Sequence, residues 1–84
     1  MDVETVVKSI IIDVMNLDIA PDALANSTPL LGGELGINSL LGLQILIMLE
    51  RHFGFEIEDD DLTRELFSDI DHLITFVRAK TQAA

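Results

Sequence analysis

The chain of 84 residues contains no cysteine, no tryptophan and no tyrosine. Without cysteine it forms no disulfide, offers no thiolate to a metal ion and has no thiol nucleophile of its own. Any thiol chemistry therefore requires a group attached to the chain. Aromatic residues are also scarce, with only four Phe, so the core has to be built from aliphatic side chains. This composition favours small packed helices.

Basic residues are few as well, with five Lys and Arg against fifteen Asp and Glu and a net charge of −10. Such a charge repels a phosphate backbone, which argues against binding to nucleic acid or to an anionic membrane and favours basic partners. Residues 35–49, the longest stretch without a charge, are too few and too polar to span a membrane, and the N-terminal residues lack the basic start of a signal peptide. We expect one monomeric, cytoplasmic domain over residues 1–84.

Hydrophobic periodicity predicts helices over residues 3–17, 39–53 and 68–77, and a short helix over residues 62–67. Asp2 and the segment 68–71 carry the residue types that cap helix starts, and Gly54 is suited to end the second helix. Residues 18–37 contain both prolines and predict a long loop. We expect apolar side chains to attach that loop to the core, and these are Ile19, Leu24, Leu30, Leu31 and Leu35.

The run LGINSLL, residues 35–41, lies where the long loop gives way to the most apolar predicted helix, and we interpret it as the functional site. Asn38 can cap the second helix, because its side-chain oxygen can accept a backbone N–H of the first turn. Ser39 then lies in that turn, where a phosphate ester is favoured by about 0.3–1 kcal/mol because of the helix dipole. Gly36 can adopt backbone angles that are closed to other residues. The alternative is that these residues form only a structural cap.

The second predicted helix is apolar on more than one side. A stripe formed by Ile45, Leu46, Leu49 and Phe53 can face the core. Leu40, Leu43 and Ile47 follow helical spacing along another side and predict an exposed strip that binds a partner. The alternative is a central helix that is buried on all sides.

Catalytic and metal-binding patterns are weak. His52 lies at the opposite end of the predicted helix from Ser39, about 20 Å away at 1.5 Å per residue, and cannot act as its base. His72 is not excluded by the sequence, although a lone histidine in an amphipathic helix is usually a surface residue. Asp59, Asp60 and Asp61 lack the glycine and the alternating ligands of a calcium loop. We expect no metal site and no catalytic residues, and a hydrolase that uses Ser39 is the least favoured interpretation.

The segment LGINSL at residues 35–40 resembles the LGxDSL attachment motif of acyl and peptidyl carrier proteins. The resemblance extends from the first helix to Val77 and includes the long first loop, the mid-chain serine and the acidic composition. It implies an all-α fold, a small four-helix bundle with a long first loop and a short third helix. It also implies that a phosphopantetheinyl transferase uses coenzyme A to attach 4'-phosphopantetheine to Ser39, within a site that includes Gly36, Asn38 and Leu40.

In such a carrier, acyl or aminoacyl intermediates are held as thioesters on the terminal thiol of the arm. The partners implied are the transferase, the loading enzymes and the downstream biosynthetic enzymes. The family docks partners on the second helix, which corresponds here to Leu40, Leu41, Leu43, Ile47 and Glu50. The carrier itself catalyses nothing, since its tether raises the effective concentration of the cargo at each partner.

This sequence departs from the family pattern at several positions. Asn38 replaces the usual Asp and lacks the charge that helps to hold the transferase's divalent metal. Leu41, Gln44 and Arg51 stand where fatty-acid-type carriers tend to be acidic, and the segment before Asn38 is more similar to polyketide-type carriers. We therefore expect a free-standing carrier in a specialised, polyketide-like or other secondary pathway. The alternative is a helical adaptor that binds partners through the apolar strip without modification.

Overall fold

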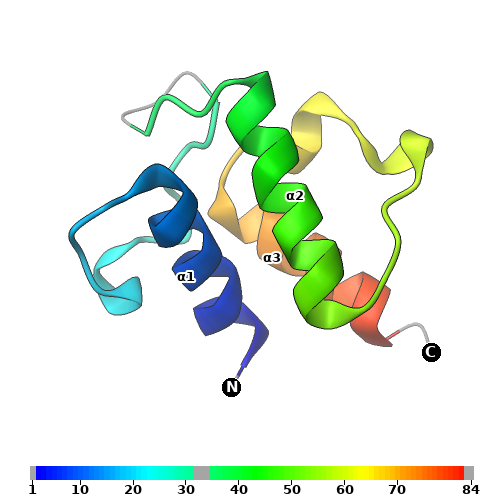
Figure 1. Ribbon diagram of the computed structural model, residues 1–84, viewed down its shortest axis with the longest axis horizontal. Coiled ribbons are helices and arrows are strands. Elements are labelled where there is room, and N and C mark those ends of the chain that lie inside the picture. The colour runs from blue at the N-terminus through cyan, green and yellow to red at the C-terminus, as the bar shows by residue number, and fades with distance from the viewer. Residues whose placement is uncertain (1, 32–34, 83–84) are drawn as a thin grey trace.

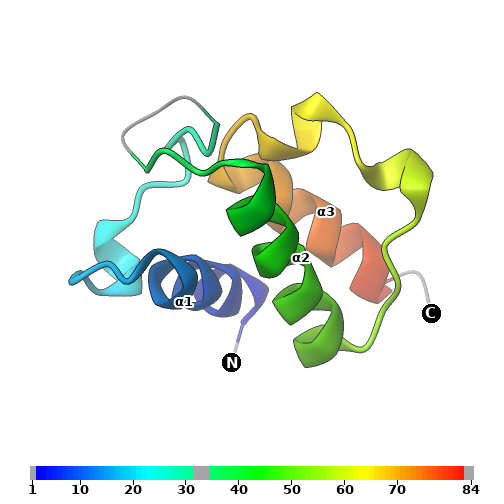
Figure 2. The same cartoon turned by 45° about the horizontal axis from the view of Figure 1, so that its top comes forward.

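A computed structural model describes residues 2–31 and 35–82. Within these residues the chain forms three α-helices and no strand: α1 (Val3–Met15), α2 (Ser39–Phe53) and α3 (Ile70–Gln82). Figure 1 shows α2 crossing in front of α3 with α1 beside them, and Figure 2 shows the three helices from a second direction. The predicted all-α fold is confirmed. The finer prediction of a four-helix bundle is not, because only three α-helices are present in the described part of the chain.

The expected short third helix is replaced by two tight turns of 3-10 helix, Asp59–Asp61 and Arg64–Phe67. Thr63 caps the second of these, since its hydroxyl accepts a hydrogen bond from the backbone N–H of Leu66 at 3.3 Å. The apolar side chains available there are too few to bury an α-helical face. Leu66 alone is fully buried from this turn, while Phe67 is half-buried.

The core is aliphatic, as the composition predicts. It is formed by α1, α2 and α3 together with a few loop residues, and α1 contacts both of the other helices. The buried apolar side chains are Val6, Val7, Ile10, Ile11, Leu24, Leu30, Ile37, Ile45, Leu46, Leu49, Leu66, Ile70, Leu73, Ile74 and Val77. Because β-branched side chains on α1 have poor helix propensity, their burial against the other helices is what stabilises α1.

The loop between α1 and α2 is attached to the core by fewer side chains than expected. Leu24 and Leu30 are buried and Leu35 is half-buried, but Ile19 and Leu31 are 44% and 42% exposed, so their predicted core role is wrong. Backbone hydrogen bonds also attach the loop to the rest of the chain. Near the start of α3, the N–H groups of residues 70 and 71 donate to the carbonyl oxygens of Thr28 and Asn26, at 3.1 and 2.9 Å. Loop carbonyls thus satisfy N–H groups that a helix start leaves unpaired.

The helix ends follow the predicted chemistry with small shifts. The Asp2 side chain accepts from Thr5 N at 2.7 Å, and Gly54 ends α2 in the left-handed region at φ +73°. At α3, the pattern over residues 68–71 predicts a capping box that begins at Ser68, but the capping residue is Asp69, one position later. Asp69 accepts from the backbone N–H of His72 at 2.9 Å and also pairs with the His72 ring at 2.7 Å.

Burial on α2 differs sharply between neighbouring faces, and the same substitution on each face tests this. Ile45 is fully buried, whereas Ile47 is 41% exposed. We expect Ile45→Val to lower the free energy of unfolding by about 0.5–1.5 kcal/mol, because it leaves a small cavity. The matched control, Ile47→Val, should change it by less than about 0.5 kcal/mol. Urea unfolding measures both, and equal effects would contradict the described packing.

The pair at the start of α3 predicts a pH effect. The hydrogen bond from Asp69 raises the pKa of His72 above its ordinary value of 6.5. The stabilisation from this pair is therefore complete below pH 6.5 and is lost as the pH rises through the raised pKa. NMR titration of the His72 ring should show the raised pKa, and Asp69→Asn should bring it back toward 6.5. A His72 pKa that does not respond to Asp69→Asn would show that the pair does not form in solution.

Candidate functional site

The start of α2 is defined by Asn38. Its backbone is extended, with φ −96° and ψ 178°, and its Oδ1 accepts a hydrogen bond from the N–H of Leu41 at 2.9 Å. The predicted cap is thereby confirmed, and the first helical residue is Ser39. Because Asn38 satisfies only one of the unpaired N–H groups, the start of α2 keeps its electropositive character next to Ser39.

Ser39 is exposed to solvent. Its side chain is carried by the first helical residue, which places the hydroxyl beside the positive end of the dipole. A phosphodiester on this oxygen would be stabilised there by the helix dipole and the free N–H groups. Leu40, the next residue, is 74% exposed, so the approach to Ser39 is open on that side as well.

The segment before α2 fixes the position of the cap. Ile37 is buried, and its N–H donates to the carbonyl oxygen of Leu30 at 3.2 Å. Gly36 has φ +61°, a conformation that side-chain-bearing residues rarely adopt, and a Cβ added there would meet no atom within 4 Å. Glycine is therefore favoured at residue 36 by the left-handed backbone conformation, as the sequence predicts, and not by a lack of space for a side chain.

An apolar hollow of about 330 Å³ opens beside Asn38 and Ser39. Its walls come from α2, from the first loop and from the segment between α2 and α3. They include Leu31, Gly42, Leu43, Leu46, Leu62 and Phe67. Gly42 allows Phe67 to lie close to α2, because a Cβ on residue 42 would be 3.3 Å from the Phe67 ring. Ser39 thus lines an apolar hollow while it remains exposed to solvent.

The site also includes Leu31, Leu62 and Phe67, which the sequence pattern does not predict. They come from three separate segments, and no local pattern connects them with Ser39. Leu62 is 50% exposed despite being apolar. An isolated leucine between Asp61 and Thr63 is the one signal in the sequence that points to an exposed apolar role.

The predicted exposed strip on α2 is present. Leu43 and Ile47 are 51% and 41% exposed and continue the face that begins at Leu40. The alternative of a helix buried on all sides is wrong. Leu41 is half-buried. Glu50 is also half-buried, and its Oε2 accepts a hydrogen bond from the N–H of Ile57 at 2.8 Å. One oxygen of this carboxylate is therefore already used in a hydrogen bond within the protein.

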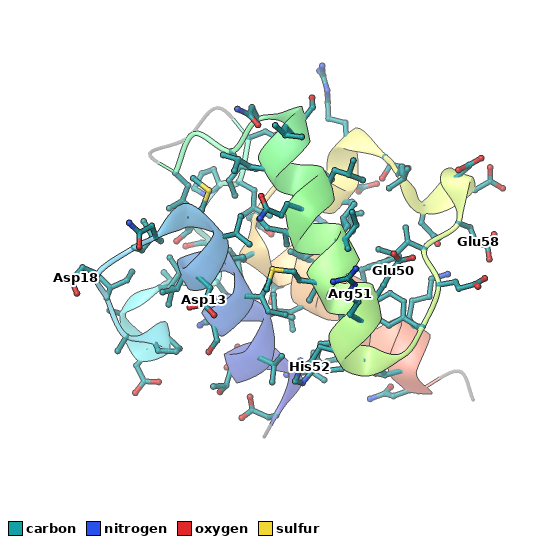
Figure 3. All side chains as sticks on the ribbon, in the orientation of Figure 1. Asp13, Asp18, Glu50, Arg51, His52 and Glu58 are labelled. Carbon is teal, nitrogen blue, oxygen red and sulfur yellow. The ribbon has the colours of Figure 1, made fainter. Side chains whose placement is uncertain are left out.

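Neither histidine lies beside Ser39 in the arrangement that a hydrolase would need. His52 lies in the last turn of α2 (Figure 3), at the opposite end from Ser39. Its ring packs edge-on to that of Phe53, with the two ring centroids 4.8 Å apart. His72 is exposed and pairs with Asp69 on α3. No cluster of three or more potential ligands within residues 2–31 and 35–82 is arranged to hold a metal ion. None of the helices described is long and apolar enough to cross a membrane.

A comparison with protein-family models matches residues 5–77 to the family described as "Phosphopantetheine attachment site". The match covers most of the chain, with all of α2, most of α1 and the first part of α3. The chain belongs to the phosphopantetheine attachment family. No curated protein and no solved structure matches it. The resemblance to acyl and peptidyl carrier proteins seen in the sequence is therefore confirmed at the level of the family.

The cofactor of this carrier family is 4'-phosphopantetheine, which is attached covalently. The residues present fit such a group, because they combine an exposed hydroxyl, an electropositive helix start and an apolar wall. The phosphodiester end of the arm suits the amides at the start of α2. The arm supplies the thiol that the cysteine-free carrier lacks.

The cap predicts how α2 responds to substitution of Asn38. Asn38→Ala should lower the free energy of unfolding by about 1 kcal/mol, because the N–H of Leu41 loses its acceptor. Asn38→Asp should leave stability unchanged or slightly higher, since Asp caps equally well and adds a negative charge at the helix start. Urea unfolding at low salt measures both variants. An Asn38→Ala variant that is as stable as the wild type would mean that the capping hydrogen bond contributes nothing.

Proposed function

We propose that this carrier holds acyl or aminoacyl intermediates as thioesters on a phosphopantetheine arm attached to Ser39. The observation that carries the proposal is the placement of Ser39, whose exposed hydroxyl follows the Asn38 cap at the start of α2. The family match supports a phosphopantetheine arm, and the geometry favours this serine as its anchor. Gly36, Asn38 and Leu40 form the rest of the attachment site, and residues 1–84 form one carrier domain.

The chain is acted upon in this function and does not itself catalyse the reaction. A transferase brings coenzyme A to the Ser39 hydroxyl. The serine oxygen forms a bond to the phosphorus that bears the pantetheine group, the phosphoanhydride bond of coenzyme A breaks, and adenosine 3',5'-bisphosphate leaves. A base of the transferase takes up the serine proton. The Asn38 cap fixes the start of α2, so that Ser39 and the remaining free N–H groups of the first turn can face the phosphoryl group. Loading and downstream enzymes then act on the cargo, while the flexible arm keeps its effective concentration high at their active sites.

Partner enzymes are proposed to dock on the exposed strip of α2. Leu40, Leu43 and Ile47 present contiguous apolar side chains near Ser39, and exposed apolar patches of this kind are typical of interaction sites. Leu41 and Glu50 border the strip. A partner seated here has the arm within reach, which is what a carrier requires.

The pathway proposed is a specialised one, polyketide-like or otherwise secondary, in the cytoplasm. Its support is the character of α2, where Leu41, Gln44 and Arg51 stand in place of acidic residues. The hollow beside Ser39 is lined mainly by leucine and phenylalanine side chains, which favours an apolar acyl group over a charged aminoacyl group as the cargo.

The attachment site is tested by incubating the protein with coenzyme A and a promiscuous phosphopantetheinyl transferase. The intact mass should rise by one phosphopantetheinyl group in the wild type and should not rise in Ser39→Ala. The control is Ser27→Ala, because Ser27 is also exposed but lies in the first loop. This variant should gain mass as the wild type does.

A mass gain that persists in Ser39→Ala would show that the arm is attached to a residue other than Ser39. No gain in any variant, with a known carrier modified in the same tube, would favour the adaptor alternative. In that case Ser39→Ala would leave partner binding intact, and only substitutions in the strip, such as Ile47→Asp, would abolish it.

A further inference from the structure

The exposed apolar strip of α2 ends in a positive charge. Leu40, Leu43, Ile47 and Arg51 are separated by three, four and four residues, so they lie along one face of the helix. Arg51 is exposed, and Figure 3 shows it on α2 beyond the middle of the helix. A partner that covers the three apolar side chains and continues along α2 therefore meets a guanidinium group.

Arg51 is not neutralised by its neighbours on α2. Glu50 is the only acidic residue of this helix, and it points toward the segment that follows α2, where its Oε2 accepts from Ile57 N. The two ion pairs found among residues 2–31 and 35–82 are Lys80–Asp61 and His72–Asp69, and neither involves Arg51. Among the residues described, the strip on α2 therefore ends in an exposed cation that takes part in neither ion pair, on a chain with a net charge of −10.

A groove of about 520 Å³ between α1 and α2 adjoins the same position. Its apolar lining includes Val6, Ile10 and Met48, and Arg51 and His52 line it from α2. Asp13, from α1, lines it as well and supplies a negative charge that weakens the local positive potential. The groove has room for an apolar side chain of a partner next to the group that meets Arg51.

A cation in the last turn also stabilises α2 through the helix dipole. That role requires only a position near the C-terminal end, and His52 occupies such a position too. It does not require the cation to continue the face formed by the exposed leucines and isoleucine. The alignment of Arg51 with the strip is therefore a separate observation from its place in the last turn.

We propose that the α2 face docks a helical segment of a partner enzyme that carries apolar side chains followed by a carboxylate, which pairs with Arg51. This proposal rests on the docking role proposed above for α2 and names the chemistry of the partner. It reverses the expectation of basic partners that the overall composition gives. The local arrangement decides the contact, because charges beyond about 8–10 Å are screened at physiological salt.

Two synthetic helical peptides test the proposal. Both peptides carry three leucines at the spacing of the strip. They differ at one position, one helical turn after the last leucine, which is Glu in one peptide and Lys in the other. Binding to the isotope-labelled carrier is measured by NMR titration at physiological salt, where distant charges of the carrier are screened. The net charge of the carrier favours the Lys peptide, whereas the proposal predicts that the Glu peptide binds about two- to fivefold more tightly.

The decisive variant is Arg51→Glu, which should reverse the preference in favour of the Lys peptide. Its matched control is Arg78→Glu, because Arg78 is exposed on α3 and the change in net charge is the same. This control should retain the preference for Glu. Asp13→Asn should increase that preference, since it removes the negative charge that lines the groove.

The proposal is overturned if the Lys peptide binds as well as the Glu peptide, if Arg51→Glu and Arg78→Glu behave alike, or if neither peptide shifts the α2 resonances. Ser39→Ala should bind both peptides as the wild type does. The outcome is therefore separate from the attachment of the arm, and failure of either proposal is recognisable without the other.

Discussion

The hydrogen bond from Leu41 N to Asn38 Oδ1 fixes where α2 begins, and the rest of the site depends on that position. If the helix began one residue later, Ser39 would take the place of the cap and its hydroxyl would accept a backbone N–H. With Asn38 as the cap, the serine is free of that task and lies at the electropositive end of the helix. The buried Ile37 and the left-handed Gly36 hold the cap in place from the other side.

The same helix supplies the core and the proposed docking surface. Ile45 and Leu49 are completely buried, so the rotation of α2 about its axis is fixed by packing against the other elements. That rotation in turn determines that Leu43 and Ile47 face solvent. The exposed strip is thus a consequence of how the aliphatic core packs, and its proximity to Ser39 follows from helix geometry alone.

Much of this was predictable from the sequence because the deciding interactions are local. A cap is formed between residues three apart, and helical periodicity separates Ile45 from Ile47. The third predicted helix was wrong in type, because a segment with a single buried side chain, Leu66, gains too little from burial to form α-helix. The hollow beside Ser39 was missed, since Leu62 and Phe67 reach it only through tertiary packing. No periodic pattern records such contacts.

The central claim is that one serine at the start of α2 anchors the arm. Peptide mapping by tandem mass spectrometry, applied to the protein purified from the cells that produce it, tests this most directly. The account predicts a phosphopantetheinyl group on the peptide that contains Ser39, with fragment ions that assign it to that residue. A peptide that carries no such group while the group is found on another residue, or a protein that carries none when its pathway is active, would contradict it.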